Sequence, residues 1–342
     1  MTARTMPARP DEDDAGLRPV PWRRMAGVTW RQHRFALAGV AVLLGGLAVW
    51  LWIIGTPLHR GYAAAVACHP ASSAACQNLI STFAASATSN FMGDKGPGGV
   101  LLQLVPALIG AFVGAPLLAR EMETGTFRYA WTQGFGRRRW AIAKLVTLAI
   151  AVTAAAQALS LVFAWYNQPF FAAGYGIPFS TRVFDLNGVA FAAWTLAAFA
   201  IGALAGMLIR RVVPAIATTL VVYAGLAFTT AVYLRQHYLT PLLASNSNLS
   251  GSAWVVSEWY SKAGQPSLPG RGPQLVSTLQ KLCPAMNTSP AQCLTAHGYT
   301  QWQSYQPGSR FWTFQCIEAG WLLVLSALLI AVAVWLVRRR AA

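Results

Sequence analysis

Charged side chains are scarce in this chain. Of its 342 residues, 11% are Asp, Glu, Lys or Arg, whereas 55% are hydrophobic. Soluble domains carry roughly 25% charged residues, so the composition argues against an ordinary water-soluble protein. The composition predicts an integral membrane protein in which most residues face lipid or other helices.

Two kinds of site are also missing from the sequence. No phosphate-binding loop of the form Gly-x-x-x-x-Gly-Lys-Ser/Thr is present, so the chain cannot hydrolyse ATP by that route. The five histidines are scattered without metal-ligand spacing; they are His33, His59, His69, His237 and His297. No nucleophile and base can be paired from local sequence either. We therefore expect no catalytic residue, metal or cofactor in this chain.

What the sequence does contain is a set of long apolar runs. Six of them reach the roughly 20 residues needed to cross a bilayer. They are residues 35–54, 100–119, 140–165, 189–209, 212–234 and 314–337. The fourth and fifth nearly merge, but Arg210, Arg211 and Pro214 divide them and indicate a tight turn at the membrane edge. The sequence predicts an all-α fold with six transmembrane helices.

The basic residues predict which way these helices are oriented. An even number of spans places both termini on one side, and 18 of the 26 Lys and Arg residues fall on that side. Eight fall in the longer segments 55–99, 166–188 and 235–313. By the positive-inside rule the termini are cytoplasmic and these three segments face outward. The net charge of +16 is then explained by topology and contact with anionic lipid rather than by nucleic-acid binding.

The N-terminal region has two parts. Residues 1–20 are rich in charge and proline and are expected to be disordered. Over residues 21–34, Trp22, Met25 and Trp30 would share one face of a helix with arginines around it. Such an amphipathic helix would lie along the cytoplasmic membrane surface, and an ordinary juxtamembrane anchor remains the alternative.

Within the spans, charged side chains are almost absent. Lys144 and Glu318 lie near span ends, where extension of the side chain toward the headgroups is the ordinary explanation. No ionisable group of the kind that ion-coupled carriers need is visible at mid-span. A transporter with neither an ion relay nor an ATP site must take its energy from another subunit.

Small residues and cysteines predict further contacts. Gly202 and Gly206 in the fourth span form a small-x-x-x-small pattern that lets helices approach closely, within the chain or in a dimer. All five cysteines fall in the outward segments or at their edge, where disulfides form. Short loops favour the pairs Cys68–Cys76 and Cys283–Cys293, which leaves Cys316 as a buried small residue at the head of the last span.

The polar stretch between the second and third spans is the most informative motif. It reads Arg120-Glu121-Met122-Glu123-Thr124-Gly125-Thr126, then Trp131-Thr132-Gln133, Arg137-Arg138-Arg139-Trp140 and Lys144. This order resembles the cytoplasmic loop after the second span of ABC-2 type transporter permeases, in the branch found in actinomycetes. The start of the last span, Arg310-Phe311-Trp312-Thr313-Phe314-Gln315, is similar to the same branch. Gly134-Phe135-Gly136 departs from it, because members often carry Pro or Ser in that turn.

The resemblance implies a dimer of permeases with two ATP-binding cassette subunits, which would bind ATP and Mg²⁺, on the cytoplasmic side. The first part of the loop would begin a coupling helix that docks on the ATPase, since acidic side chains and Thr suit a helix N-terminus. Its residues are Glu121, Glu123, Gly125, Thr126 and Arg128. Arg137, Arg138 and Arg139 would anchor the loop to lipid phosphates. Replacing Glu121 and Glu123 with Ala is expected to uncouple transport while leaving the spans packed.

The leading hypothesis is a permease subunit of an exporter for hydrophobic or amphiphilic compounds in the plasma membrane, powered by a separate ATPase. One alternative is a polytopic membrane enzyme acting on lipids, which would need a catalytic cluster near an interface. The other is a signalling or assembly protein that uses residues 235–313 to bind a ligand.

Overall fold

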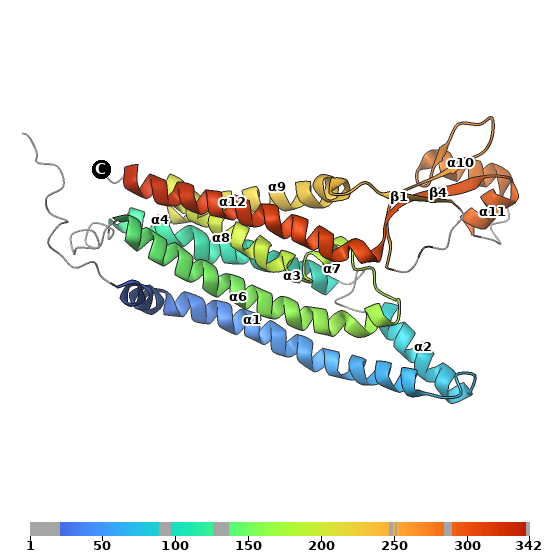
Figure 1. Ribbon diagram of the computed structural model, residues 1–342, viewed down its shortest axis with the longest axis horizontal. Helices are drawn as coiled ribbons and strands as arrows, with labels where there is room; N and C mark the ends of the chain where they lie inside the picture. Colours follow the sequence, from blue (N-terminus) through green and yellow to red (C-terminus); the bar gives the residue numbers. More distant parts are fainter. Residues whose placement is uncertain are drawn as a thin grey trace, which may run out of the picture.

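The helices form an elongated bundle, and a small domain with a β-sheet extends from one end of it (Figure 1). The computed structural model describes residues 21–88, 97–125, 137–245, 249, 252–283 and 289–339. The end that carries the β-sheet is called the sheet end. The opposite end, where the described chain both begins and finishes, is called the terminal end (Figure 1).

Among the described residues, six helices are long and apolar enough to cross a membrane, which confirms the six-span expectation. They are α1 (Trp22–Ala67), the second span α3–η2–α4 (Pro97–Ile109, Gly110–Gly114 and Ala115–Thr124), α6 (Arg137–Ala172), α8 (Ala190–Ile209), the fifth span α9–η3–η4 (Val212–Thr229, Thr230–Leu234 and Arg235–His237) and α12 (Phe311–Arg339). The expected tight turn is present between α8 and α9. Arg210 closes α8 in the left-handed conformation, with φ 59°.

The first helix is longer than the span assigned to it from sequence. Its 46 residues amount to roughly 69 Å at about 1.5 Å each, against a hydrocarbon core of about 30 Å. Figure 1 shows its first turns, in dark blue, nearly end-on, whereas the remainder runs along the bundle beside α6. Residues 21–34 and 35–54 therefore belong to one bent helix. A disulfide between Cys68 and Cys76 closes the turn from α1 to α2 (Ala74–Thr88).

At the centre of the bundle is α8. It packs on α12, α6, the second span and α9, whereas α1 contacts mainly α6 and α2. Ten of its twenty residues are alanine or glycine, and such small side chains let neighbouring backbones approach. Gln315 of α12 holds its N-terminus, because the Gln315 side-chain oxygen accepts hydrogen bonds from the backbone N–H groups of Val189 and Ala190.

The small-x-x-x-small pattern of α8 is used inside the chain. A Cβ atom added at Gly202 would overlap the carbonyl oxygen of Gly110, and one added at Gly206 would overlap that of Ala115. The opposing surface includes Gly110 and Gly114, which bound the π-helical turn η2. Gly202 and Gly206 thus join the fourth span to the second, and the close approach requires glycine on both helices.

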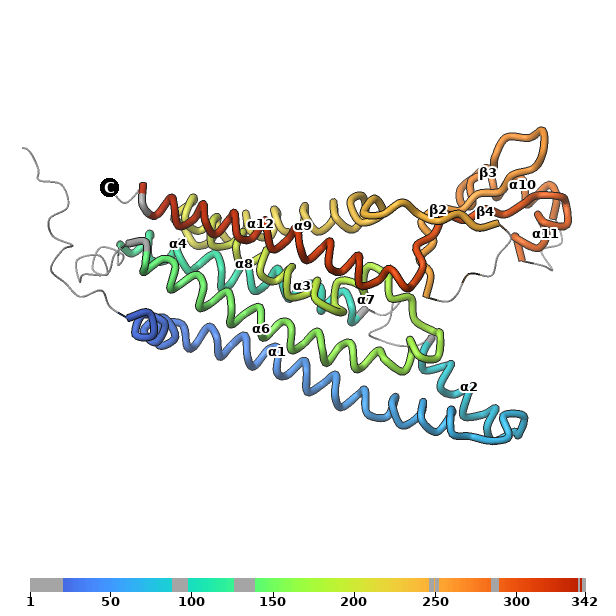
Figure 2. Tube along the Cα trace, viewed as in Figure 1, coloured from blue at the N-terminus to red at the C-terminus, as the bar shows by residue number. Residues whose placement is uncertain are grey.

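The segment between the fifth and sixth spans forms a small α/β domain that the sequence analysis did not anticipate. Its four antiparallel strands are ordered β1-β4-β2-β3. They are β1 (Leu242–Ser245), β2 (Trp254–Ser261), β3 (Leu268–Pro269) and β4 (Thr300–Gln306). Two helices, α10 (Pro273–Leu282) and α11 (Pro290–Ala296), complete a core that includes Tyr260 and Leu294. β1 follows the fifth span and β4 precedes the sixth, so the domain is connected to those two spans (Figure 2).

The remaining cysteines lie in this domain and at the start of α12. Cys283 and Cys293 form a disulfide that joins the end of α10 to α11. Both bridges are therefore the pairs that the loop lengths favour. Cys316 is a free thiol on the exposed surface of α12, so the expectation that it is buried is wrong.

Candidate functional site

Three charged side chains meet at the sheet end of the bundle. Asp185 follows the short helix α7 (Thr181–Phe184), Arg235 begins η4 and Glu318 lies in α12. Arg235 donates to Glu318 through Nε at 2.9 Å and through Nη2 at 2.7 Å, and Nη2 also pairs with Asp185. The exposed fraction of the Glu318 side chain is 0% and that of Arg235 is 2%. We call Asp185, Arg235 and Glu318 the sheet-end cluster.

Further hydrogen bonds explain why Glu318 is stable in this position. Trp194 of α8 donates from Nε1 to one Glu318 oxygen at 2.8 Å, and the Tyr238 hydroxyl donates to the other at 3.2 Å. A buried carboxylate is tolerated when it is paired with a cation and fully hydrogen-bonded. The expectation that Glu318 extends toward the headgroups is therefore wrong, because its charge is neutralised inside the bundle.

Asp185, the remaining member of the cluster, is hydrogen-bonded to the second span. Gln103 of α3 donates from Nε2 to Asp185 at 2.9 Å and to the carbonyl of Thr181 at 3.0 Å. Burial raises the pKa of Asp185 to about 6, an increase that Arg235 opposes and Glu318 reinforces. The cluster thus connects the second, fourth, fifth and sixth spans and contains a carboxyl group with an elevated pKa.

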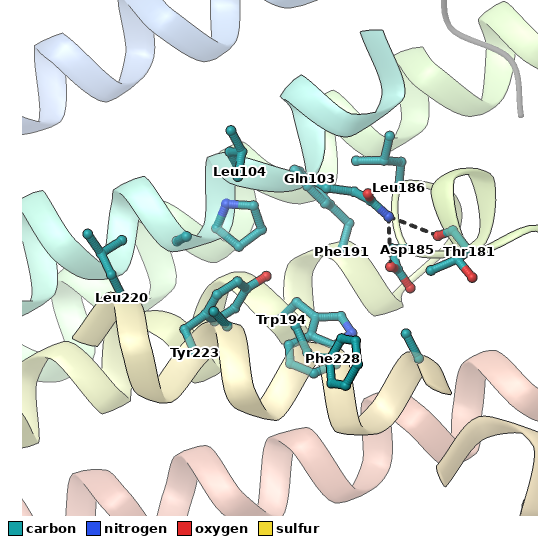
Figure 3. A pocket seen from close by; sticks show the side chains of 15 residues that line it. Gln103, Leu104, Thr181, Asp185, Leu186, Phe191, Trp194, Leu220, Tyr223 and Phe228 are labelled. Carbon is teal, nitrogen blue, oxygen red and sulfur yellow. Dashed lines mark hydrogen bonds between the residues drawn. The ribbon is translucent and has the colours of Figure 1, made fainter. Parts of the chain in front are cut away.

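A pocket of about 400 Å³ lies beside the cluster, between α3, α7, α8 and α9. Figure 3 shows Gln103, Thr181 and Asp185 together at one end and Leu220 toward the other. Its wall is otherwise mostly apolar and aromatic, formed by Leu104, Phe191, Trp194, Tyr223 and Phe228 among others. This volume is in the range of small-molecule sites, and Gln103, Thr181 and Asp185 form a polar corner that could orient a ligand.

A second pair of opposite charges is buried at the terminal end. Lys144 of α6 is 1% exposed and pairs with Glu121 of α4; we call these two residues the terminal-end pair. The Lys144 ammonium also lies 5.2 Å from the centroid of the Trp140 ring. The interpretation of Lys144 as a side chain extending to the headgroups is therefore wrong.

The acidic residues of the loop motif occupy a different helical position from the one expected. Glu121 and Glu123 lie in the last turns of α4, and Gly125 follows that helix with φ 70°, so these two residues end a helix rather than begin one. Their role in coupling to an ATPase remains a prediction. Glu123 accepts a hydrogen bond at 3.2 Å from the backbone N–H of Val212, at the start of α9. Its carboxylate faces the favourable, N-terminal end of that helix. Thr126 and Arg128 lie outside the described residues.

The three arginines of the motif begin the third span. Arg137, Arg138 and Arg139 are the first residues of α6. The Arg139 guanidinium lies 5.0 Å from the centroid of the Trp22 ring, so it connects the starts of α6 and α1. Contact of these arginines with lipid phosphates remains a prediction.

The sequence analysis missed Asp185 and Arg235. Arg235 is 50 residues from Asp185 and 83 from Glu318 along the chain, and no local pattern brings them together. One feature could have indicated a cluster: Glu318 and Lys144 are isolated charges within apolar runs, and such charges usually have a partner.

Comparison with known proteins gives one match. The family model described as ABC-2 membrane transporter related matches residues 40–235, more than half of the chain. That range contains most of the first five spans and two members of the sheet-end cluster. No curated protein and no solved structure matches the chain.

Proposed function

The chain belongs to the ABC-2 membrane transporter related family, and from that premise we propose that it is the permease subunit of an ATP-driven exporter of hydrophobic or amphiphilic compounds in the plasma membrane. Membership of this family makes it a multi-pass transporter subunit. The choice of substrate is supported by the pocket, an open recess of about 400 Å³ with mostly apolar walls. A sugar or inorganic ion would find few polar groups there.

The energy would come from a separate ATP-binding cassette subunit, with ATP and Mg²⁺ bound there, because this chain has no phosphate-binding loop. The terminal end offers a place for such a subunit to act. Glu121 connects α4 to α6, and Glu123 connects α4 to α9. A partner that displaces the end of α4 would therefore also displace the third and fifth spans. Since α3 and α9 line the pocket, this movement would reach the substrate site.

A homodimer forms part of this proposal. The fifth span exposes several large apolar side chains, including Val213, Val221 and Phe228, and few of its residues are buried within one chain. A second copy packed there would cover this surface and would place two pockets near one interface. Lipid would cover the remaining apolar surface of α1 and α12.

Co-purification tests the proposal. The tagged permease, extracted gently from its native membrane, should retain an ATP-binding cassette subunit, and lipophilic compounds should stimulate ATP hydrolysis by that complex. Recovery of the permease without an ATPase under several mild conditions would refute the powered-exporter proposal.

Labelling of single cysteines tests the orientation. In intact cells a membrane-impermeant maleimide should modify a cysteine at position 270, in the sheet domain, and should not modify one at position 128. Each cysteine is introduced into a parent chain in which the free Cys316 is replaced by Ser. The same parent without an added cysteine gives the background labelling. Labelling at 128 alone would reverse the proposed topology.

A further inference from the structure

The sheet-end cluster contains unequal numbers of positive and negative groups. Two carboxylates, Asp185 and Glu318, share one guanidinium, Arg235. Glu318 is fully buried, and its two oxygens receive hydrogen bonds from Arg235, Trp194 and Tyr238. With both carboxylates ionised, the cluster carries one surplus negative charge.

That surplus charge is accessible only through Asp185. The Asp185 side chain keeps an exposed fraction of 22%, against 0% for Glu318, and it forms part of the pocket wall. Figure 3 shows Asp185 beside Gln103 and Thr181 at the polar end of the pocket. The Gln103 amide donates to Asp185 and to the Thr181 carbonyl but is neutral, and the single charge of Arg235 is shared between Asp185 and Glu318.

The rest of the pocket favours a positively charged ligand as well. Among the described residues, no Lys, Arg or His lines the pocket, and the guanidinium next to Asp185, that of Arg235, is shared with Glu318. An anionic group would therefore meet the surplus negative charge of the cluster. Four aromatic rings lie in the pocket wall, those of Phe191, Trp194, Tyr223 and Phe228. Aromatic faces attract ammonium groups, most strongly where water is excluded.

We propose that this pocket binds an amphiphile with a single positive charge, whose ammonium group lies against Asp185 and whose apolar part extends along Leu104 and Leu220. The proposal rests on the proposed function for its role in transport, and it names the substrate class of the same site. Binding itself is a property of this chain alone. A failure of the ATPase test and a failure of cation binding are therefore separate results.

The charge of Asp185 makes the binding dependent on pH. The charged and titratable groups around it are Arg235 from η4, Glu318 from α12 and Tyr223 from α9, while α3 contributes the neutral Gln103. Because the pKa of Asp185 is raised to about 6, the carboxylate is ionised above that pH and neutral below it. Affinity for a cation should thus fall as the pH is lowered through this region.

A direct binding measurement tests this. The full-length protein in phosphatidylcholine nanodiscs would be titrated with decyltrimethylammonium, decanol and decyl sulfate, with empty nanodiscs as the background. Decyltrimethylammonium does not titrate, so its pH profile reports on the protein. After subtraction of partitioning, it should bind at least about tenfold tighter than decanol at pH 7.5. Equal or tighter binding of decyl sulfate would overturn the proposal.

Substitutions test whether Asp185 is responsible for cation binding. Asp185→Asn should weaken cation binding at least about tenfold and abolish its pH dependence, whereas Asp185→Glu should retain most of both. Glu258→Gln neutralises a carboxylate in the sheet domain and should bind like the parent. Parent-like cation binding by a folded Asp185→Asn protein would refute the role of this residue.

A second variant keeps the test decisive if Asp185→Asn does not fold. Ala224 lies on the exposed side of α9 and lines the pocket, so Ala224→Phe should fill the space without disturbing the cluster. It should weaken decyltrimethylammonium and decanol alike. Unchanged binding of both probes in this variant would place the site elsewhere.

Discussion

Charged groups are buried at both ends of the bundle, but the two groups differ in composition and in connections. The sheet-end cluster has two carboxylates for one guanidinium and lies beside a pocket. The terminal-end pair is one carboxylate with one ammonium, between the second and third spans. The sheet-end cluster has one more acidic group than basic groups, whereas the terminal-end pair has one of each and connects two helices.

This contrast indicates a division of roles. A buried cluster with unequal numbers of acidic and basic groups lowers the stability of the fold, and such clusters are retained where they perform a function. The composition of the sheet-end cluster therefore fits a binding site. A balanced pair at a span end needs no ligand to satisfy it. It fits a mechanical connection through which the α4 end can act on neighbouring helices.

The largest effect is expected from removal of the shared cation in the sheet-end cluster. Arg235→Met would leave Asp185 and Glu318 buried together without a positive partner, which should cost about 3–5 kcal/mol of unfolding free energy. Thermal unfolding and the monodisperse yield after purification would measure this loss. Arg271→Met, at an exposed position of the sheet domain, is the matched control and should be neutral.

The same variant offers a rescue. Arg235→Met combined with Asp185→Asn and Glu318→Gln removes all three charges and should recover much of the lost stability. A stable Arg235→Met protein with parental yield would show that the cluster is not held together by its charges.

At the terminal end, Glu121→Ala should destabilise the protein by about 1–3 kcal/mol, because it leaves the Lys144 ammonium buried without a partner. The loss should be smaller than for Arg235→Met, since Glu121 is 21% exposed and water can approach the site. Lys144→Met in the same chain should restore most of the thermal stability. This result would reverse the expectation from sequence that the two loop carboxylates can be removed without affecting the packing of the spans.

The sequence predicted the helices better than it predicted their contacts. The features that were predicted correctly depend on residues that are close together in the chain. They are the six apolar runs, the turn at Arg210 and the two short-loop disulfides. The sheet-end cluster depends on side chains from four spans, and the order of β1-β4-β2-β3 depends on pairings across about 60 residues. The glycine pattern of α8 was visible, but its partner Gly110-x-x-x-Gly114 went unrecognised, so its contact could not be assigned.

That glycine contact joins the second span, which carries Glu121, to the fourth span, whose Trp194 donates to Glu318. Gly202→Ala would place a Cβ atom against the carbonyl oxygen of Gly110, and such overpacking costs about 1–3 kcal/mol. Gly225→Ala in α9 is the matched control, because no atom beyond its chain neighbours and its own helix backbone lies within 4 Å of the added Cβ. It should be neutral or slightly stabilising in thermal unfolding. Equal midpoints for the two variants would contradict the close packing of α8 on the second span.

The smallest effect on stability is expected at the other loop carboxylate. Glu123→Ala removes one hydrogen bond to the Val212 backbone at an exposed site, which should cost about 0.5–1.5 kcal/mol at most. If this bond transmits movement from α4 to α9, the variant should lose substrate-stimulated ATP hydrolysis in the complex while keeping its fold and its bound ATPase. Glu123→Gln keeps an oxygen acceptor and should retain more stimulation than the Ala variant. Full stimulation in Glu123→Ala would leave Glu121 and Lys144 as the connection at the terminal end, and coupling would then run through the third span rather than the fifth.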